Sequence, residues 1–105
     1  MIDVTPTEYL DSLAGRPDTL LLDVREDWEV AIATLPGATH IPMGQIPDRL
    51  AELPRDATIV VYCKAGSRSA TVARYLEDRG FARVVNLAGG VLAWQATVDG
   101  SLATY

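Results

Sequence analysis

Short apolar runs alternate with segments of helical spacing along most of this chain. Three almost entirely apolar runs predict buried strands, at residues 19–24, 59–62 and 84–87. A briefer strand is expected at residues 39–41, where Pro42 ends it. Strands that are apolar on both faces are typical of parallel sheets, which helices cover on both sides.

Helical segments are expected between these strands. The clearest one starts with Thr5 as the N-cap, Pro6 at the first helical position and Glu8 closing a capping box. This helix is expected to end near Gly15. Further helices are expected at residues 27–33, 47–53, 69–79 and 90–98. The alternation predicts an α/β fold, a three-layer sandwich with a mainly parallel central sheet and helices on both faces.

Length and charge narrow the classes of function. A chain of 105 residues with 49% hydrophobic residues is long enough for one core and too short for two ordinary domains, so we expect a single domain over residues 1–105. The formal net charge of −5 argues against nucleic-acid binding, which needs a basic face. Neither an apolar stretch of about 18 residues nor a secretory leader is visible, so we expect no membrane association and a cytoplasmic location.

The strand at residues 59–62 ends at Cys63 and Lys64, the only cysteine and the only lysine of the chain. The loop continues with Ala65, Gly66, Ser67, Arg68 and Ser69. A strand-to-helix turn of small residues collects backbone N–H groups at the positive end of a helix dipole, which makes an anion site. In parallel sheets, ligands bind beyond the carboxyl ends of the strands, where this loop is expected.

A thiolate is itself an anion, so the same turn favours ionisation of Cys63. Helix N-termini and nearby cations lower a cysteine pKa from about 8.5 toward roughly 3.5–7.5, and Lys64 and Arg68 flank this thiol. Cys63 is therefore a candidate catalytic nucleophile, with a small buried structural cysteine as the alternative. A single cysteine forms no internal disulfide, and any covalent intermediate on it must be discharged to an outside molecule.

The length of the loop separates two classes of cysteine enzyme. The spacing from Cys63 to Arg68 is C-x-x-x-x-R, one residue shorter than the phosphatase loop, whose arginine would fall at Ser69. The shorter loop resembles the active-site loop of rhodanese-type sulfurtransferases. Residues 21–26, 35–42 and 86–94 look like three further blocks of that family, in the family's order. The resemblance covers most of the chain and implies a rhodanese-like fold.

The resemblance also implies a reaction. The Cys63 thiolate would take the outer sulfur of a donor such as thiosulfate, release sulfite and become a persulfide, with no cofactor and no metal. Cyanide, a thiol or a sulfur-carrier protein would then accept the sulfur. Residues 94–105 look like the end of rhodanese domains fused to adenylyltransferases that thiolate sulfur-carrier proteins, which adds such an enzyme as a suggested partner.

By the same resemblance, the loop from Lys64 to Ser69 binds the substrate, its N–H groups stabilising the persulfide and Lys64 and Arg68 attracting the donor. Arg68 has a second interpretation, in which it holds the loop by bonding carbonyls or a carboxylate. The resemblance suggests that Asp23 and Arg25 shape the rim of the site; the alternative for them is an ion-pair network that fastens loops.

The remaining candidates are interpreted as structural. His40, the only histidine, lies in a structural block rather than in a catalytic pair. Trp28 and Trp94 are expected in the core. Two other functions stay open: a non-catalytic rhodanese-like binding module, which commonly lacks the cysteine, and a small-loop phosphatase or arsenate reductase.

Overall fold

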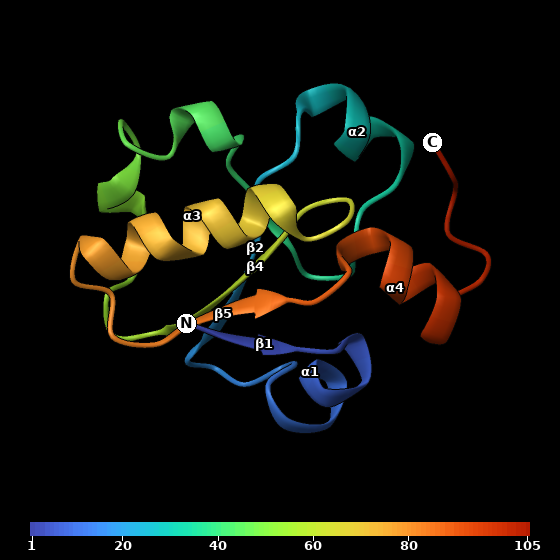
Figure 1. The fold of residues 1–105 in the computed structure, drawn as a ribbon, viewed down its shortest axis with the longest axis horizontal. Coiled ribbons are helices and arrows are strands. Elements are labelled where there is room, and N and C mark those ends of the chain that lie inside the picture. The colour runs from blue at the N-terminus through green and yellow to red at the C-terminus, as the bar shows by residue number, and fades with distance from the viewer.

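The computed structural model describes residues 1–105 and contains a five-stranded sheet between helices (Figure 1). The strands are β1 Ile2–Val4, β2 Thr19–Asp23, β3 Thr39–His40, β4 Thr58–Tyr62 and β5 Val84–Leu87. Their spatial order is β1-β5-β4-β2-β3, and every neighbouring pair is parallel. The predicted α/β fold is confirmed, and the sheet is wholly rather than mainly parallel. Strand β1 was not predicted, because three residues with Asp3 in the middle give no apolar run.

Four helices connect or follow the strands. They are α1 Pro6–Ser12, α2 Asp27–Ile32, α3 Ser67–Asp78 and α4 Gly90–Thr97. The prediction of a helix at residues 47–53 is wrong: the segment between β3 and β4 contains two short 3-10 helices, Met43–Gln45 and Leu50–Glu52. Residues 47–49 form turns instead of the first helical turn, and Pro54 ends the segment because it biases Leu53 toward the extended conformation seen there. None of the helices has the length and apolar composition that crossing a membrane requires.

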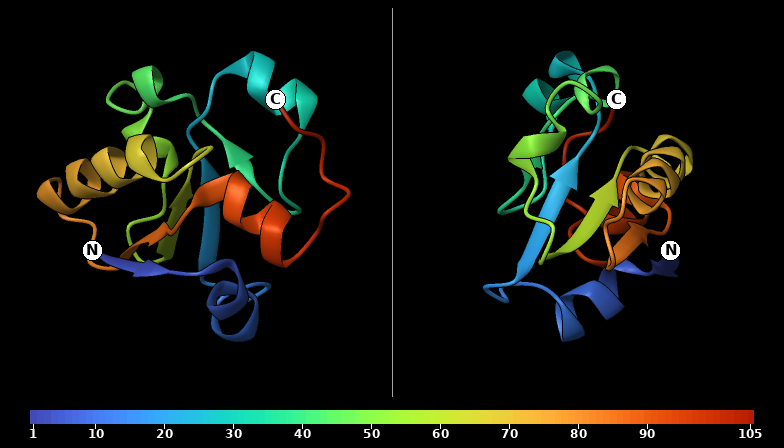
Figure 2. Two further views of the ribbon diagram at one scale, coloured as in Figure 1. Left: turned by 45° about the vertical axis from the view of Figure 1, so that its right-hand side comes forward. Right: turned by 90° about the vertical axis from the view of Figure 1, so that its left-hand side faces the viewer.

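The carboxyl ends of β2 and β4 lie side by side, since Asp23 is paired with Tyr62 in the register of the two strands. The loops that leave these two strands therefore start from the same edge of the sheet, which Figure 2 shows in two orientations. The amino end of α4 reaches this edge as well, because Val91 N–H donates to the carbonyl oxygen of Cys63 at 3.0 Å. The predicted catalytic loop thus lies where three elements meet.

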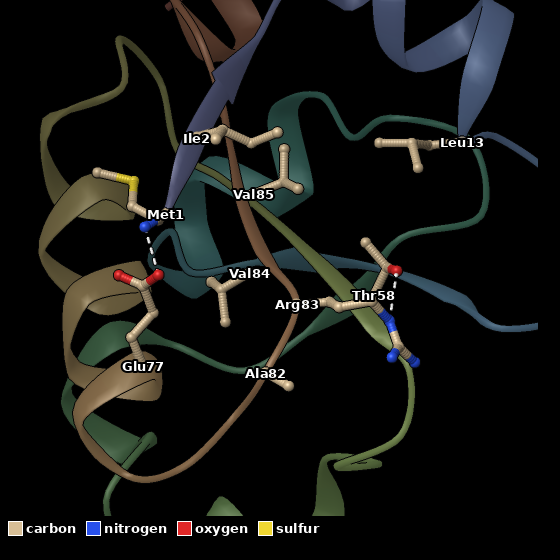
Figure 3. Close-up of a pocket in the computed structure, with 9 residues that line it drawn as sticks. All are labelled: Met1, Ile2, Leu13, Thr58, Glu77, Ala82, Arg83, Val84 and Val85. Atoms are coloured by element: carbon tan, nitrogen blue, oxygen red, sulfur yellow. Dashed lines mark hydrogen bonds and ion pairs between the residues drawn. The ribbon is translucent and has the colours of Figure 1, made fainter.

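The opposite edge of the sheet carries a shallow apolar groove of about 400 Å³ (Figure 3). Its walls come from β1 and from the amino ends of β4 and β5, and include Ile2, Thr58 and Val84. None of the residues that line it belongs to the Cys63 loop. This hollow is therefore separate from the candidate site.

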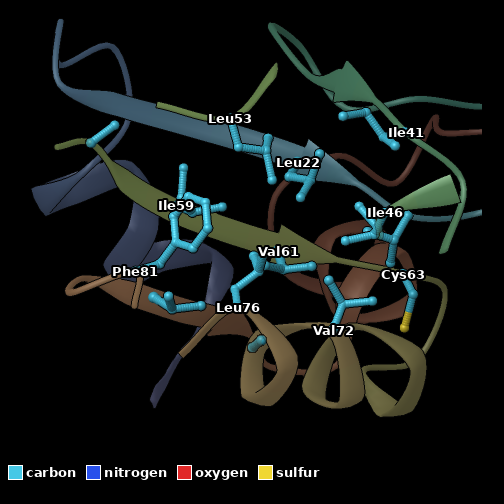
Figure 4. Close-up of a cluster of buried hydrophobic side chains, with 14 residues drawn as sticks. Leu22, Ile41, Ile46, Leu53, Ile59, Val61, Cys63, Val72, Leu76 and Phe81 are labelled. Atoms are coloured by element: carbon cyan, nitrogen blue, oxygen red, sulfur yellow. The ribbon is translucent and has the colours of Figure 1, made fainter. Parts of the chain in front are cut away.

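Two apolar clusters cover the two faces of the sheet, as alternating side chains of a strand require. On one face, Leu22, Ile59 and Val61 pack with Val72 and Leu76 of α3 (Figure 4). On the other face, the strand residues Leu21, Val60 and Leu87 pack with Tyr9 of α1 and Trp94 of α4. Sandwiching the sheet in this way holds β4, and the loop after it, in a fixed position.

The two tryptophans differ in their burial. Trp94 is 4% exposed and packs in the second cluster, as predicted. The prediction that Trp28 lies in the core is wrong, because its side chain is 61% exposed. Glu29 is the only buried residue of the six-residue helix α2, so the helix turns its carboxylate inward and leaves the neighbouring indole at the surface.

Candidate active site

Gly66 shapes the loop that follows β4. It has a φ of 109°, which favours glycine, and it is the N-cap of α3. A Cβ at this position would lie 3.3 Å from the backbone nitrogen of Gly89. The tight conformation begins α3 at Ser67, two residues earlier than the sequence pattern indicated. As a result, the N–H groups of the N-cap, Gly66, and of Ser69 in the first turn face back toward Cys63.

The sulfur of Cys63 lies among hydrogen-bond donors. The N–H groups of Gly66 and Ser69 donate to Sγ at 3.1 and 3.4 Å, and the Ser69 hydroxyl oxygen lies 3.4 Å from it. The Cys63 side chain is also part of the first apolar cluster, and the residue is 1% exposed. The thiol therefore sits at the bottom of the loop, on the apolar core, with its polar contacts on the loop side.

These contacts lower the pKa of Cys63. Burial raises the pKa of the thiol, but the hydrogen bonds from Ser69, followed by those from the Gly66 and Ala65 N–H groups, outweigh burial and bring it below its usual value. The predicted direction is confirmed, while the cause differs from the expected one. Hydrogen bonds within the loop favour the thiolate most, and the charge of Arg68 interacts favourably with it as well.

The guanidinium of Arg68 is paired with a carboxylate of the chain itself. Its two terminal nitrogens donate to the two oxygens of Glu29 at 2.6 and 2.9 Å, a bidentate ion pair that joins α3 to α2. Hydrogen bonding from Arg68 lowers the pKa of the Glu29 carboxyl to about 2 against the opposing effect of burial. Two roles were open for Arg68, binding an anionic donor and holding the loop through a carboxylate. The ion pair with Glu29 corresponds to the second role.

Asp23 and Arg25 form a second ion pair, and both side chains are fully buried. The Arg25 guanidinium donates to both Asp23 oxygens and to the carbonyl oxygen of Ala33 at 2.6 Å. The Tyr62 hydroxyl donates to Asp23 at 2.7 Å, and burial raises the pKa of that tyrosine to about 12. This arrangement is the loop-fastening network that the sequence offered as an alternative. Direct contact of Asp23 or Arg25 with a substrate stays a prediction.

His40 also has a structural contact. Its Nε2 lies 2.6 Å from the carbonyl oxygen of Arg25, so this nitrogen carries a proton and donates it. Nδ1 lies 3.8 Å from the exposed carboxylate of Asp27. The contact fits the structural interpretation, because it braces the turn after β2.

Sequence reasoning missed two residues of the site, Glu29 and Tyr105. The Tyr105 hydroxyl accepts a hydrogen bond from Arg25 at 3.0 Å and donates one to Glu29 at 2.8 Å. The tyrosine therefore joins the two ion pairs into one network. Its ring meets Trp28 edge-on, with centroids 5.6 Å apart, and Lys64 Nζ lies 4.4 Å from its centroid. No local signal marks either residue, because their partners lie far away along the chain.

The arrangement suits attack by a thiolate on an electrophilic atom. The N–H groups of Gly66 and Ser69 face the sulfur, and the two arginines nearby are held by carboxylates. No group of three or more His, Cys, Asp or Glu side chains is gathered as for a metal ion.

Comparison with known proteins gives consistent matches. Residues 5–97 match the sequence profile of the family described as "Rhodanese-like domain". A "Sulfurtransferase" from Allochromatium vinosum is 41% identical over 95 residues, which are 90% of this chain and 89% of that protein. The crystal structure of a rhodanese-like domain protein from Staphylococcus aureus superposes with a TM-score of 0.83 at 35% identity, covering 100% of this chain and 99% of the other.

A larger relative matches over nearly the whole chain. The "Probable adenylyltransferase/sulfurtransferase MoeZ" of Mycobacterium tuberculosis is 38% identical over 104 residues. These residues are 97% of this chain and 26% of the larger protein.

Proposed function

The chain belongs to the rhodanese-like domain family, and from this membership we propose that it moves sulfane sulfur from a donor such as thiosulfate to a thiophilic acceptor through a persulfide on Cys63. One observation carries the proposal. The sulfur of the only cysteine accepts hydrogen bonds from Gly66 and Ser69, which lower its pKa and favour the nucleophilic thiolate.

In the first step the Cys63 thiolate attacks the outer sulfur of the donor. A sulfur–sulfur bond forms at Sγ, the sulfur–sulfur bond of thiosulfate breaks, and sulfite leaves with the electron pair of that bond. The N–H groups of Gly66 and Ser69 stabilise the thiolate before the attack without reorganising. Because these donors belong to the start of α3, the helix dipole adds to their effect.

In the second step an acceptor nucleophile attacks the outer sulfur of the persulfide, and Cys63 leaves as a thiolate. A thiol of lowered pKa is a better leaving group, so the contacts that favour attack also favour release. The chain has no second cysteine that could resolve the persulfide internally. The acceptor is therefore an outside molecule, either cyanide, a thiol or a sulfur-carrier protein.

A sulfur-carrier protein, or the adenylyltransferase that activates it, is the proposed physiological partner. The proposal is supported by MoeZ, in whose name sulfur transfer is joined to adenylyl transfer, and which matches 97% of this chain. A "Putative sulfur carrier protein" of Bacillus subtilis, YrkF, is 39% identical over 75% of the chain.

The experiment is intact mass measurement after incubation with thiosulfate. We expect a gain of one sulfur atom, roughly 32 Da, that cyanide or a thiol removes and that Cys63→Ser abolishes. The 1% exposure of Cys63 favours the rival possibility, a binding module with an inert cysteine. An unchanged mass at millimolar thiosulfate, with a persulfide donor equally without effect, supports that rival.

A further inference from the structure

The segment after α4 returns to the active-site loop. Figures 1 and 2 show residues 99–105 running from the end of α4 to α2, with the last residue beside that helix. In this segment, Tyr105 contacts the site through its hydroxyl group, its ring and its main-chain oxygen. Its hydroxyl bonds Arg25 and Glu29, its ring lies against Trp28 and Lys64, and its main-chain oxygen accepts a hydrogen bond from Lys64 Nζ.

Lys64 differs from the other cations of the site. Arg25 is paired with Asp23, and Arg68 is paired with Glu29, so each arginine faces a carboxylate. Lys64 forms no ion pair with any carboxylate side chain, and its ammonium group is held by the main-chain oxygen and the ring of Tyr105. Lys64 is thus the cation next to Cys63 that no carboxylate side chain neutralises.

We propose that Tyr105 is a specificity-determining residue. It binds the Lys64 ammonium group and thereby slows the reaction of Cys63 with anionic reagents more than its reaction with neutral ones. For anionic sulfur donors such as thiosulfate, the inference rests on the sulfur transfer proposed above. An anion gains the attraction of Lys64 only after it displaces the main-chain oxygen and the ring of Tyr105. Neutral reagents gain nothing from the ammonium group, so they lose nothing while Tyr105 stays in place.

The physical reason lies in competition for one ammonium group. The aromatic ring and the main-chain oxygen of Tyr105 both stabilise the cation where it is, and the two hydrogen bonds of the Tyr105 hydroxyl anchor the ring. Removing the side chain cuts the anchors and the ring contact together. The main-chain oxygen is then no longer held at Lys64, and the ammonium group becomes available.

The test compares alkylation of Cys63 by iodoacetate, an anion, and by iodoacetamide, its neutral analogue. In Tyr105→Ala we expect the ratio of the two rates to shift toward iodoacetate about fivefold, the factor that ~1 kcal/mol of attraction to one freed charge supplies. The shift shrinks at high salt, because the Lys64 ammonium group is partly exposed and salt ions screen its charge. Thr104→Ala, an exposed change in the same segment, is the matched control and keeps the wild-type ratio.

Two further variants test the route through Lys64. Tyr105→Phe keeps the ring and loses the two hydroxyl bonds, so its ratio lies between those of wild type and Tyr105→Ala. In the double variant Lys64→Ala, Tyr105→Ala the gain for iodoacetate disappears, because the charge that causes it is gone. Unchanged far-ultraviolet circular dichroism shows that each variant is folded.

An equal acceleration of both reagents in Tyr105→Ala overturns the proposal, because it means that the tyrosine only covers the thiol. A gain for iodoacetate that persists without Lys64 overturns it as well. Alkylation does not depend on sulfur transfer, so this result stands whether or not thiosulfate reacts. If thiosulfate does react, its KM falls about fivefold in Tyr105→Ala with kcat unchanged, again the effect of one freed charge.

Discussion

The hydroxyl oxygen of Ser69 lies 3.4 Å from Cys63 Sγ and 3.1 Å from the carbonyl oxygen of Gly66. A hydroxyl has one proton, so it serves one of these acceptors at a time. When Cys63 is a thiol, its S–H donates to Ser69 while the hydroxyl donates to Gly66. When Cys63 is ionised, the hydroxyl turns to the thiolate, which is the stronger acceptor. Ser69 thus follows the charge of Cys63 by rotating one bond.

Ser69→Ala should therefore weaken the thiolate. We expect the pKa of Cys63 to rise and its alkylation by iodoacetamide at neutral pH to slow about tenfold, the effect of losing one hydrogen bond to a charged group. The pH dependence of the alkylation rate measures both. Ser67→Ala is the matched control, because that side chain is exposed and makes no hydrogen bond to Sγ. Equal slowing in the two variants would show that the serine at position 69 has no special part in ionisation.

The ion pair between Glu29 and Arg68 should make the protein sensitive to acid. The carboxyl has a pKa of about 2 in the folded state, below its ordinary value of 4.5. Its contribution to stability is therefore complete above pH 4.5 and is lost as the pH falls toward 2. Because Arg68 is one third exposed, we expect a contribution of only about 2 kcal/mol.

Urea unfolding at several pH values measures this contribution. Glu29→Gln keeps the size of the side chain and removes the titrating group, so this variant should lose less stability than wild type between pH 4.5 and 2. Glu52→Gln is the matched control, because Glu52 pairs with Arg49 on the exposed surface. If the Glu29 and Glu52 variants respond to acid alike, the Glu29–Arg68 pair is not the source of the sensitivity.

The sequence predicted those parts of the site that are formed by residues close to one another along the chain. A strand run followed by the only cysteine and a glycine turn predicts both the loop and its position at the sheet edge, and β4 and α3 confirm that arrangement. It could not assign Arg68 to one of two roles, because the deciding partner, Glu29, lies 39 residues away. Tyr105 was missed for the same reason, its contacts to Arg25 and Glu29 spanning 80 and 76 residues.

Gly90 is expected to tolerate no side chain. A Cβ there would lie 2.1 Å from the carbonyl oxygen of Cys63, and its φ of 52° is unfavourable for other residues. Gly90→Ala should push α4 off the active-site loop and destabilise the fold by about 2 kcal/mol or more. Gly44→Ala is the matched control, since a Cβ at that position meets nothing within 4 Å.

Thermal unfolding and the alkylation rate of Cys63 measure the two consequences of Gly90→Ala. Both should change, because Val91 and Leu92 of α4 donate to the carbonyl oxygens of Cys63 and Lys64 and so hold the loop. A Gly90 variant that unfolds and reacts like wild type would show that the loop keeps its shape without α4.

Phosphatase activity should be absent, because of the length of the loop and the hydrogen bonds and ion pair that its side chains already form. In the longer C-x-x-x-x-x-R loop an arginine would stand at position 69, but here that residue is Ser69, which is fully buried and bonded to Sγ. Arg68 is already engaged by both oxygens of Glu29, so no guanidinium is free to bind the equatorial oxygens of a phosphoryl group. The decisive measurement compares hydrolysis of an aryl phosphate with sulfur transfer from thiosulfate to cyanide, in wild type and in Cys63→Ser. Aryl phosphate hydrolysis that requires Cys63, in a protein that leaves thiosulfate unchanged, would refute the argument from loop length and the sulfur-transfer function with it.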